Sequence, residues 1–515
     1  MSKKLAAIDI GTNSFHLVIV EIFDNGNFEI VDNEKEVIRL SEGSTGDIKY
    51  IQPKAIERGI SALKKFAGIA KSHNAEIKAV ATSAVREASN KIDFIQKVLD
   101  ETGISISVIS GVEEGRLIYQ GVLQAVPVFN KKVLCIDIGG GSTEFVVGYK
   151  GKILYANSLK LGAVRLTKMF FENYSITNES IENCKKWVEG VLFPISKIIK
   201  NFNIDLVVGS SGTIMASGLM IKAMLEKKVT EAILNNYTFN FENLKKVEKN
   251  ILKRKTVDER KKINGLDSKR ADIIPAGVIL LSTIFEQLNF SEIIISGYAL
   301  REGIIFDSVY KEFPNVKKLF TKDIKNESVE KLAKSCNYDF KHCFHVAHLS
   351  ENIFDQLNEL HQLPKENKEY LIAAAKLHDI GFHISHSKHH KHSQYIIVNS
   401  EIMGFNENEI RTIACIARYH RKSHPKDSHE EYMLLPAEWK IIVKKLSAIL
   451  RIADAFDRTH NFLVKYINVE INKNSVVFQV ENKLEDLEIE LWSIDRKKQL
   501  FEEFYNKKVI VKSFS

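Results

Sequence analysis

The sequence carries one strand–turn–strand pattern twice, at residues 8–21 and 136–148. The two segments read IDIGTNSFHLVIVE and IDIGGGSTEFVVG. Each runs from an apolar stretch through Asp, Ile and Gly into a short polar turn, and then into a second apolar stretch. Such an internal repeat predicts two similar halves, each built around one hairpin, and it restricts the topology more than any single motif does.

The segments around the two hairpins alternate between strand and helix patterns. Residues 55–73 repeat apolar side chains every three or four positions, as in a helix. Residues 77–87, 204–213 and 293–303 each run from an apolar strand into a turn. This alternation predicts an α/β fold. After about Pro314 the pattern becomes helical, until a hairpin expected around residues 472–475, a helix and a final strand. We therefore expect four domains: residues 1–125 and 126–310 (two α/β lobes), 311–460 (all-α) and 461–515 (a small α/β appendage).

The tips of the two hairpins are suited to binding phosphate. Small residues let backbone N–H groups approach phosphate oxygens closely, and hydroxyl side chains add donors. Asp9 and Asp137 end the first strand of each hairpin, and carboxylates are ligands that Mg²⁺ prefers. A single Asp-Gly turn is common in any protein, whereas two such turns facing each other would hold a phosphate chain from both sides. The expected phosphate-binding residues are Gly11, Thr12, Asn13, Ser14, Gly139, Gly140, Gly141, Ser142, Thr143, Ser211, Gly212 and Thr213.

Six segments in this order resemble one known family. They are DIGTNSFHLVIVE, TSAVRE, ISGVEEGRLIYQG, IDIGGGSTEF, GSSGT and SGYALREG. They resemble the exopolyphosphatase/guanosine pentaphosphate phosphohydrolase (Ppx/GppA) family over about residues 5–305. The resemblance implies two actin-like (ribonuclease-H-like) lobes with the active site in the cleft between them. It also implies release of orthophosphate from polyphosphate, from pppGpp or from both, with Mg²⁺ or Mn²⁺, in a homodimer.

Two adjacent carboxylates open a predicted helix in the segment SGVEEGRLIYQG. From the residues alone, Glu113 and Glu114 are both compatible with a helix start, where negative charge is favourable. The resemblance implies that Glu114 is the general base that activates water, and that Glu113 is the carboxylate at the helix start.

Further residues of the catalytic group follow from the resemblance. It implies that Asp9 and Asp137 hold the metal and that Glu144 points toward the metal or the attacking water. Arg86 is expected to contact phosphate as a forked donor, with a surface ion pair to Glu87 as the alternative. Arg301 and Glu302 are expected to pair with each other rather than to act in catalysis.

Composition limits the class of protein. Lys and Arg number 73 against 65 Asp and Glu, so the formal net charge is +8, which favours a polyanionic partner or a solvated basic surface. The five cysteines form no CxxC pair, which is typical of reduced thiols in a cytoplasmic protein. The first residues resemble no signal peptide, and no apolar stretch approaches the ~20 residues that span a bilayer. We expect no membrane and no nucleic-acid partner.

Histidine is concentrated in the second half of the chain. Fourteen of the 16 histidines lie between His342 and His460. The order of His345, His378-Asp379 and Asp454 predicts an HD-type site, in which imidazoles and carboxylates bind a divalent metal. A buried His–Asp pair that only holds helices together is the alternative. Further candidate ligands are His389, His390, His392 and His420, and the nearby cations Lys388, Lys391, Arg418, Arg421 and Lys422 form a predicted basic patch.

Three functions are compatible with this sequence. The leading interpretation is an exopolyphosphatase that also acts on pppGpp. A small-molecule kinase on the same actin-like scaffold is the second, because similar turns hold ATP phosphates in such kinases. The third is a non-catalytic sensor that binds polyphosphate or (p)ppGpp.

Overall fold

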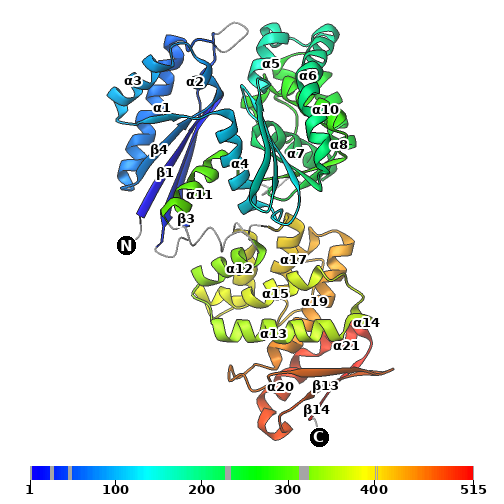
Figure 1. Ribbon diagram of the computed structural model, residues 1–515. Helices are drawn as coiled ribbons and strands as arrows, with labels where there is room; N and C mark the ends of the chain where they lie inside the picture. Colours follow the sequence, from blue (N-terminus) through cyan, green and yellow to red (C-terminus); the bar gives the residue numbers. More distant parts are fainter. Residues whose placement is uncertain are drawn as a thin grey trace. The chain divides into compact units, whose positions relative to one another are not determined.

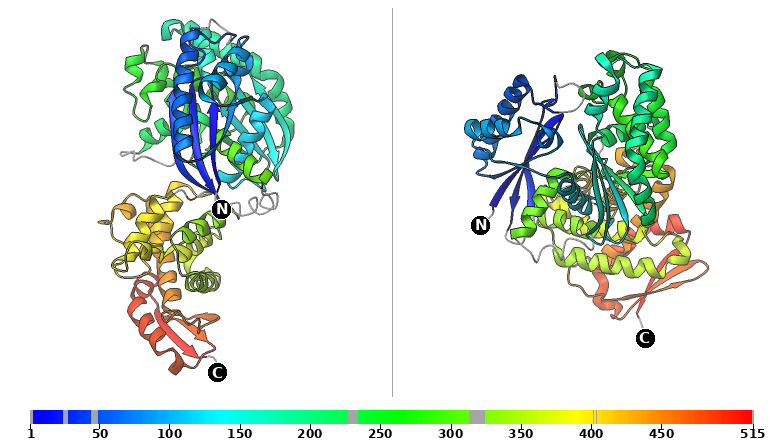
Figure 2. Two further views of the ribbon diagram at one scale, coloured as in Figure 1. Left: turned by 90° about the vertical axis from the view of Figure 1, so that its left-hand side faces the viewer. Right: turned by 45° about the horizontal axis from the view of Figure 1, so that its top comes forward.

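The computed structural model describes residues 3–23, 28–43, 49–226, 234–312, 324–400, 402 and 404–513. The chain divides into two compact units, Met1–Ile324 and Lys325–Ser515 (Figures 1 and 2). Within the described ranges, no helix is both long and apolar enough to cross a bilayer.

The first unit begins with a five-stranded sheet. Its strand order is β3 (Phe28–Val37), β2 (Ser14–Ile22), β1 (Lys3–Ile10), β4 (Glu76–Ala81) and β5 (Ile106–Val108). The first three strands pair antiparallel, and β4 and β5 continue in parallel from β1. Ala6, Ile8 and Ile10 share a core with the helices α1 (Pro53–Ser72) and α3 (Lys91–Thr102), because alternate residues of a strand face the same side. The short helix α2 (Ser83–Glu87) follows β4.

A second sheet repeats this arrangement and extends it by one strand. Its order is β10 (Thr238–Asn240), β11 (Glu292–Ile295), β9 (Leu206–Ser210), β6 (Val133–Ile138), β7 (Thr143–Tyr149) and β8 (Lys152–Leu159). Again three strands, β6, β7 and β8, pair antiparallel, and β9 and β11 continue in parallel from β6; the added strand β10 pairs antiparallel with β11. The covering helices are α5 (Ala163–Phe170), α6 (Asn178–Ile199), α7 (Ser211–Leu225), α8 (Phe241–Leu252) and α10 (Ile274–Leu288), with a short α9 (Val257–Arg260). The predicted duplication is confirmed, and both copies end β1 or β6 at the same kind of turn.

Two helices lie between the sheets, α4 (Gly111–Ala125) and α11 (Leu300–Glu312) (Figure 1). They cross so closely that a Cβ on Gly303 would lie 2.0 Å from the carbonyl oxygen of Leu117, and a Cβ on Gly121 would lie 2.4 Å from that of Ala299. The predicted boundary near residue 310 assigns α11 to the second lobe, but α11 packs on α4 and β1. The chain therefore returns to the first sheet after the second is complete.

The second unit is a helical bundle that continues into a small sheet. Its helices are α12 (Ile324–Ser335), α13 (Phe340–Gln356), α14 (Asn358–His361), α15 (Asn367–Leu377), α16 (His389–Val398), α17 (Glu407–Arg418), α18 (Glu430–Met433) and α19 (Ala437–Ala455). The sheet has the order β12 (Ile467–Ile471), β13 (Ser475–Val480) and β14 (Lys508–Ser513), with α20 (Glu488–Lys497) and α21 (Gln499–Tyr505) beside it. The hairpin predicted around residues 472–475 joins β12 to β13. The boundary expected at residue 460 does not interrupt the core, because Phe456, Phe478 and Phe501 form one chain of aromatic contacts.

The helix crossing generates a stability prediction with a matched control. Gly303→Ala places a methyl group against the backbone of α4, so we expect a loss of about 2–3 kcal/mol in the free energy of unfolding. Gly68→Ala adds the same methyl group to α1, where no atom lies within 4 Å of the new Cβ. There the higher helix propensity of alanine should stabilise the protein by about 0.5–1 kcal/mol. Urea titration of both variants measures the difference, and equal stability of Gly303→Ala and the wild type would contradict the close crossing.

Candidate active site

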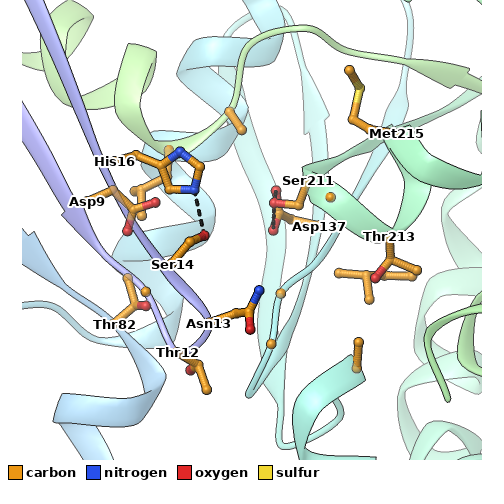
Figure 3. A pocket seen from close by; sticks show the side chains of 18 of the residues that line it. Asp9, Thr12, Asn13, Ser14, His16, Thr82, Asp137, Ser211, Thr213 and Met215 are labelled. Atoms are coloured by element: carbon orange, nitrogen blue, oxygen red, sulfur yellow. Dashed lines mark hydrogen bonds between the residues drawn. The ribbon is translucent and has the colours of Figure 1, made fainter. Parts of the chain in front are cut away.

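The turns at the ends of β1 and β6 line one cavity of about 380 Å³ (Figure 3). The β1–β2 turn contributes Gly11 to Ser14, and the β6–β7 turn contributes Gly139 to Ser142. Figure 3 shows Asp9 and Asp137 on opposite sides of this cavity, with the side chain of Asn13 between them. Other lining residues come from the start of α7 and from the loop before α11.

Four carboxylates line the cavity: the exposed Asp267 and three others, Asp9, Glu114 and Asp137. Burial, reinforced by the negative charge of Glu114, raises the pKa of Asp9 to about 8, and Arg301 opposes this shift. Burial likewise raises the pKa of Glu114 to about 7, although Arg86 acts in the opposite direction. Oδ1 of Asp9 is buried and has no hydrogen-bond partner in the structure. An unpartnered oxygen beside two further carboxylates fits a site for a divalent cation, which would relieve their mutual repulsion.

Asp137 is fixed by two serines at the start of α7. The hydroxyl of Ser210 donates to Oδ2 of Asp137 at 2.6 Å, and that of Ser211 donates to Oδ1 at 2.7 Å. These hydrogen bonds favour the ionised carboxylate, whereas burial raises its pKa. The side chain therefore stays in place with its oxygens directed toward the cavity.

Glu114 sits in the first turn of α4, where the sequence predicts a helix start. The Ser110 hydroxyl caps this helix by accepting the backbone N–H of Glu113 at 3.2 Å. Glu113 forms a two-pronged ion pair with Arg116, with N–O distances of 2.7 and 2.8 Å, and does not line the cavity. Glu114 is buried with its carboxylate in the cavity wall. The two adjacent carboxylates thus have different surroundings, as the resemblance implies.

Arg86 lies behind Glu114 rather than in the cavity wall. Its Nη1 donates to Oε2 of Glu114 at 2.9 Å and to the carbonyl oxygen of Ile109 at 2.9 Å. The alternative pairing of Arg86 with Glu87 is not formed, because Glu87 pairs with Arg165 at 2.8 Å. Arg86 is therefore placed to orient Glu114, and the direct phosphate contact expected for it is not supported by this geometry.

The duplication places different residues at equivalent positions next to the two aspartates. Asp9 pairs across the sheet with His16, and Asp137 pairs in the same way with Glu144. His16 lines the cavity, and its Nε2 forms a hydrogen bond of 2.8 Å with the Ser14 hydroxyl. Burial and the charge of Arg301 lower the pKa of His16 to about 3. Glu144 is buried beyond the cavity wall and accepts a hydrogen bond from Ser158 at 2.8 Å. Burial and the charge of Glu114 raise the pKa of Glu144.

Three cations line the cavity, and the sequence motifs predict none of them as a phosphate ligand. They are Lys35 on β3, Arg270 before α10 and Arg301 at the start of α11. Arg301 pairs with Glu302 at 3.3 Å, as expected, but also faces the cavity. Arg270 lies directly over Gly212, since a Cβ on Gly212 would be 1.6 Å from Nη2 of Arg270. The glycine in the predicted GSSGT turn therefore makes room for a guanidinium that no local pattern identifies.

Eleven of the twelve residues predicted to bind phosphate line the cavity; the exception is Thr143. Its side chain is buried, and its hydroxyl donates to the carbonyl oxygen of Leu161 at 2.6 Å. The prediction for Thr143 is wrong because it is the first residue of β7, where the strand turns its side chain into the core.

Sequence comparison with known families matches the chain in two parts. Residues 18–312 match the Ppx/GppA phosphatase family, and residues 324–498 match domain III of Ppx/GppA phosphatases. The chain belongs to the Ppx/GppA phosphatase family. This confirms the resemblance of the six sequence segments and supports a phosphoanhydride hydrolase.

Solved structures give the same family. An exopolyphosphatase from Cytophaga hutchinsonii is 30% identical with a TM-score of 0.55, and it is matched over 98% of its length by 60% of this chain. A Ppx/GppA family member from Aquifex aeolicus is 28% identical with a TM-score of 0.51, matched over 99% of its length by 61% of this chain. The predicted actin-like lobes are confirmed by these similarities and by the two sheets.

The second unit brings together most, but not all, of the predicted HD-type ligands. His378, Asp379 and Asp454 lie in one cluster. The histidine of α13 that joins them is His342, not His345. His345 lies one helical turn later, with its ring edge-on to Phe462, so the prediction for His345 is wrong.

Among the additional histidines, the cluster includes His389 and His420. His390 and His392 belong to no group of potential metal ligands among the described residues. Of the predicted basic patch, Arg421 and Lys422 line the cavity beside this cluster, whereas Lys388, Lys391 and Arg418 do not.

The raised pKa of Asp9 generates a prediction about stability and pH. An aspartate whose folded-state pKa is about 8, against an ordinary value of 3.8, favours the folded state only while it is protonated. As the pH rises from about 4 to 8, the unfolded chain ionises freely and the folded protein loses stability. Asp9→Asn removes this penalty, and its amide can donate to the neighbouring carboxylates. In a metal-chelating buffer we expect Asp9→Asn to be more stable than the wild type by about 1–3 kcal/mol at pH 8.

Calorimetric unfolding from pH 4 to 9 measures this difference. The melting temperature of Asp9→Asn should exceed that of the wild type by a margin that grows with pH and becomes constant above pH 8. Equal melting temperatures across the range would show that Asp9 ionises without penalty.

Proposed function

We propose that the chain is an exopolyphosphatase that releases orthophosphate from the end of inorganic polyphosphate and also converts pppGpp to ppGpp. The observation that carries this proposal is Glu114, a buried carboxylate with a pKa of about 7 in a cavity lined by two phosphate-binding turns. A base with a pKa near neutrality is effective at accepting a proton from water. The similarity to a protein described as an exopolyphosphatase supports the choice of substrate.

In the proposed reaction, a water molecule attacks the terminal phosphorus while Glu114 accepts a proton from it. The bond between the terminal phosphorus and its bridging oxygen breaks, and the bridging oxygen leaves with the chain, so the products are orthophosphate and a chain shortened by one phosphate. Arg86 orients Glu114 through the hydrogen bond at 2.9 Å. The two turns hold the terminal phosphate, since phosphoryl transfer depends mainly on positioning and charge stabilisation.

Asp9 and Asp137 would hold a divalent ion, Mg²⁺ or Mn²⁺, which would neutralise charge on phosphoryl oxygens. The buried, unpartnered Oδ1 of Asp9 is the observation behind this assignment. Glu144 lies behind the wall and accepts a hydrogen bond from Ser158, so we assign it to the support of this site rather than to direct contact.

The three lining cations support a substrate with several phosphates in a row. Lys35, Arg270 and Arg301 come from three separate elements. Each can neutralise phosphate oxygens, and the guanidinium groups can do so with two parallel hydrogen bonds. Both polyphosphate and the 5′-triphosphate of pppGpp present such a chain.

Replacing the proposed base tests the mechanism. Glu114→Gln keeps the size of the side chain but cannot accept the proton, so we expect phosphate release from long polyphosphate to fall by a factor of about 10²–10⁴. Binding of polyphosphate should change little. The matched control is Glu113→Gln, which changes the adjacent carboxylate that pairs with Arg116 outside the cavity.

Phosphate release is measured side by side from long polyphosphate, short polyphosphate and pppGpp, without any acceptor molecule. Full activity of Glu114→Gln would exclude the proposed base. Wild-type protein that releases phosphate only when an acceptor is added would favour the kinase. Binding without turnover in the presence of Mg²⁺ would favour the sensor.

Arg270 provides a second test, of how the phosphate chain is held. Arg270→Ala removes a charge-assisted contact, so we expect kcat/KM for polyphosphate to fall about 10–100-fold, mainly through KM. Lys269→Ala removes the neighbouring cation, which is exposed and does not line the cavity, and should leave kcat/KM within about twofold of the wild type. Equal effects of the two substitutions on kcat/KM would indicate general charge rather than a contact by Arg270.

A further inference from the structure

Six potential metal ligands from separate parts of the second unit converge at one point. They are His342 on α13, His378 and Asp379 after α15, His389 on α16, His420 after α17 and Asp454 on α19. All are buried apart from Asp379, which is partly exposed. Buried charged and polar groups are retained only where they are paired or bind something, so a cluster of this size requires an explanation.

The four imidazole rings are all oriented in the same way. Nδ1 of His378, His389 and His420 donates to the backbone carbonyl three residues earlier, at 2.7, 3.2 and 2.7 Å. Nδ1 of His342 donates instead to the carboxylate of Asp457 at 2.8 Å. With the proton on Nδ1, each ring presents the lone pair of Nε2 to the cluster. A hydrogen bond from the other ring nitrogen to a carbonyl or carboxylate is the usual support for a metal-binding histidine.

The ligand atoms form two groups that share Asp379. In the first group, two imidazole nitrogens face two carboxylate oxygens. Nε2 of His378 lies 3.6 Å from Oδ2 of Asp379 and 3.8 Å from Oδ1 of Asp454. Nε2 of His342 lies 3.9 Å from the same Asp379 oxygen and 3.7 Å from the same Asp454 oxygen. In the second group, Oδ1 of Asp379 lies 3.3 Å from Nε2 of His389 and 3.7 Å from Nε2 of His420. Donor atoms that share one ion at ~2.1 Å lie ~3.0–3.4 Å apart, so small shifts would close each group around an ion.

A purely structural His–Asp network is less compatible with these contacts. Nε2 of His378 and Oδ1 of Asp379 are buried and have no hydrogen-bond partner in the described structure. In a structural network, each imidazole would donate to a carboxylate from the side that faces it. Here the facing nitrogens carry lone pairs and meet carboxylate oxygens, which is repulsive unless a cation lies between them.

We propose that the second unit binds two divalent transition-metal ions bridged by Asp379, and that the cavity above them hydrolyses a phosphate ester. His342, His378, Asp379 and Asp454 hold the first ion, and Asp379, His389 and His420 hold the second. The mixed imidazole and carboxylate ligands favour ions such as Mn²⁺, Fe²⁺ or Zn²⁺ over Mg²⁺, which prefers oxygen ligands.

The cavity beside the cluster has the properties of a phosphate-ester site. Its volume is about 310 Å³, and Asp379, His389, His420 and Asp454 line it. Its other walls are basic, with Arg421, Lys422, Arg451, Arg458, Arg496 and Lys497. Trp492 and Phe382 add aromatic surface, and the guanidinium of Arg496 lies 4.8 Å from the centre of the Trp492 ring. Cations beside an aromatic side chain fit a phosphate joined to a planar ring, as in a nucleotide.

Two basic residues contact the ligands directly and have consequences for metal loading. Lys497 donates to Oδ2 of Asp454, which leaves Oδ1 to face the histidines. Arg421 approaches Nε2 of His389 at 3.1 Å, where the second ion would bind. Arg421 must therefore move when that ion binds, and it can then contact a phosphate oxygen in the same cavity.

In the proposed reaction, water bound at the ions loses a proton and attacks the phosphorus of the ester. The P–O bond to the leaving group breaks, and the leaving oxygen takes up a proton. A diester gives an alcohol and a phosphate monoester, and a monoester gives an alcohol and orthophosphate. Two ions placed close together stabilise both the attacking and the leaving oxygen.

Metal content is the first test. The parent protein is the full-length chain with Asp9→Asn and Glu114→Gln, so that the first unit contributes neither a metal site nor activity. After chelation and reloading with Mn²⁺, we expect about two ions per chain by mass spectrometry of the metals. Adding His378→Ala and Asp379→Ala should remove both ions, and adding His420→Ala should remove one. The matched control is His348→Ala, an exposed histidine on the same helix as His342, which should retain both.

Thermal unfolding of each variant checks that it is folded. Parent protein that binds no Mn²⁺, or variants that bind as much as the parent, would overturn the metal centre.

Activity is the second test, with bis(p-nitrophenyl) phosphate as a diester and p-nitrophenyl phosphate as a monoester. The Mn²⁺-loaded parent should cleave at least one of them, at a rate reduced at least about 100-fold by His378→Ala with Asp379→Ala and unaffected by His348→Ala. Failure to cleave either probe, with the metal bound, would overturn the hydrolytic part of the proposal. Since the parent lacks Glu114 and Asp9, this result is independent of whether the first unit hydrolyses polyphosphate.

Discussion

The concentration of negative charge at Asp9, Glu114 and Asp137 is the constraint on which the first unit depends. Burial raises the pKa of all three carboxylates, and neighbouring carboxylates raise the pKa of Asp9 and of Glu114 further. The fold offsets this cost unevenly: Asp137 receives two hydroxyl hydrogen bonds, Glu114 receives Arg86, and Oδ1 of Asp9 receives no hydrogen bond in the structure. Under the proposed function, this uneven support would suit Asp137 to hold a metal ion, Glu114 to act as a base and Oδ1 of Asp9 to contact a cation.

Duplication of one hairpin explains how these groups come to face each other. Each copy has an aspartate one residue before the end of its first strand, so two lobes with similar topology present two carboxylates to a shared cavity. The copies then differ at the cross-strand neighbour, which is His16 beside Asp9 and Glu144 beside Asp137. His16 is neutral at ordinary pH because burial and Arg301 lower its pKa, so Arg301 rather than His16 supplies positive charge near Asp9.

The sequence predicts those parts of the site that depend on strand ends and turns. Asp9, Asp137 and the glycine turns lie where a strand meets a tight loop, and the alternation of apolar residues shows where such a strand ends. It does not predict Lys35 or Arg270, because each reaches the cavity only through the packing of distant elements and lies in an ordinary charged stretch. Thr143 and His345 show the opposite error, because both fit the local pattern. The first residue of β7 turns its side chain inward, and His345 lies one helical turn along from His342, where its ring meets Phe462. Dimerisation and the choice between polyphosphate and pppGpp depend on surfaces and partners that no local pattern encodes, and they stay predictions.

The two units differ in the ligand chemistry that they offer, and this difference has a consequence for their ions. The first unit presents only oxygens at Asp9 and Asp137, which suits hard ions that keep several waters and exchange readily. The second unit presents four imidazoles together with Asp379 and Asp454, a set that binds transition metals more tightly and releases them slowly. If both units bind ions as proposed, the imidazole-rich site would stay loaded while the ion in the other cavity would follow the local concentration of Mg²⁺. The two proposed chemistries would then respond to different changes in metal supply, because ligand type rather than position in the fold determines which ion each unit selects.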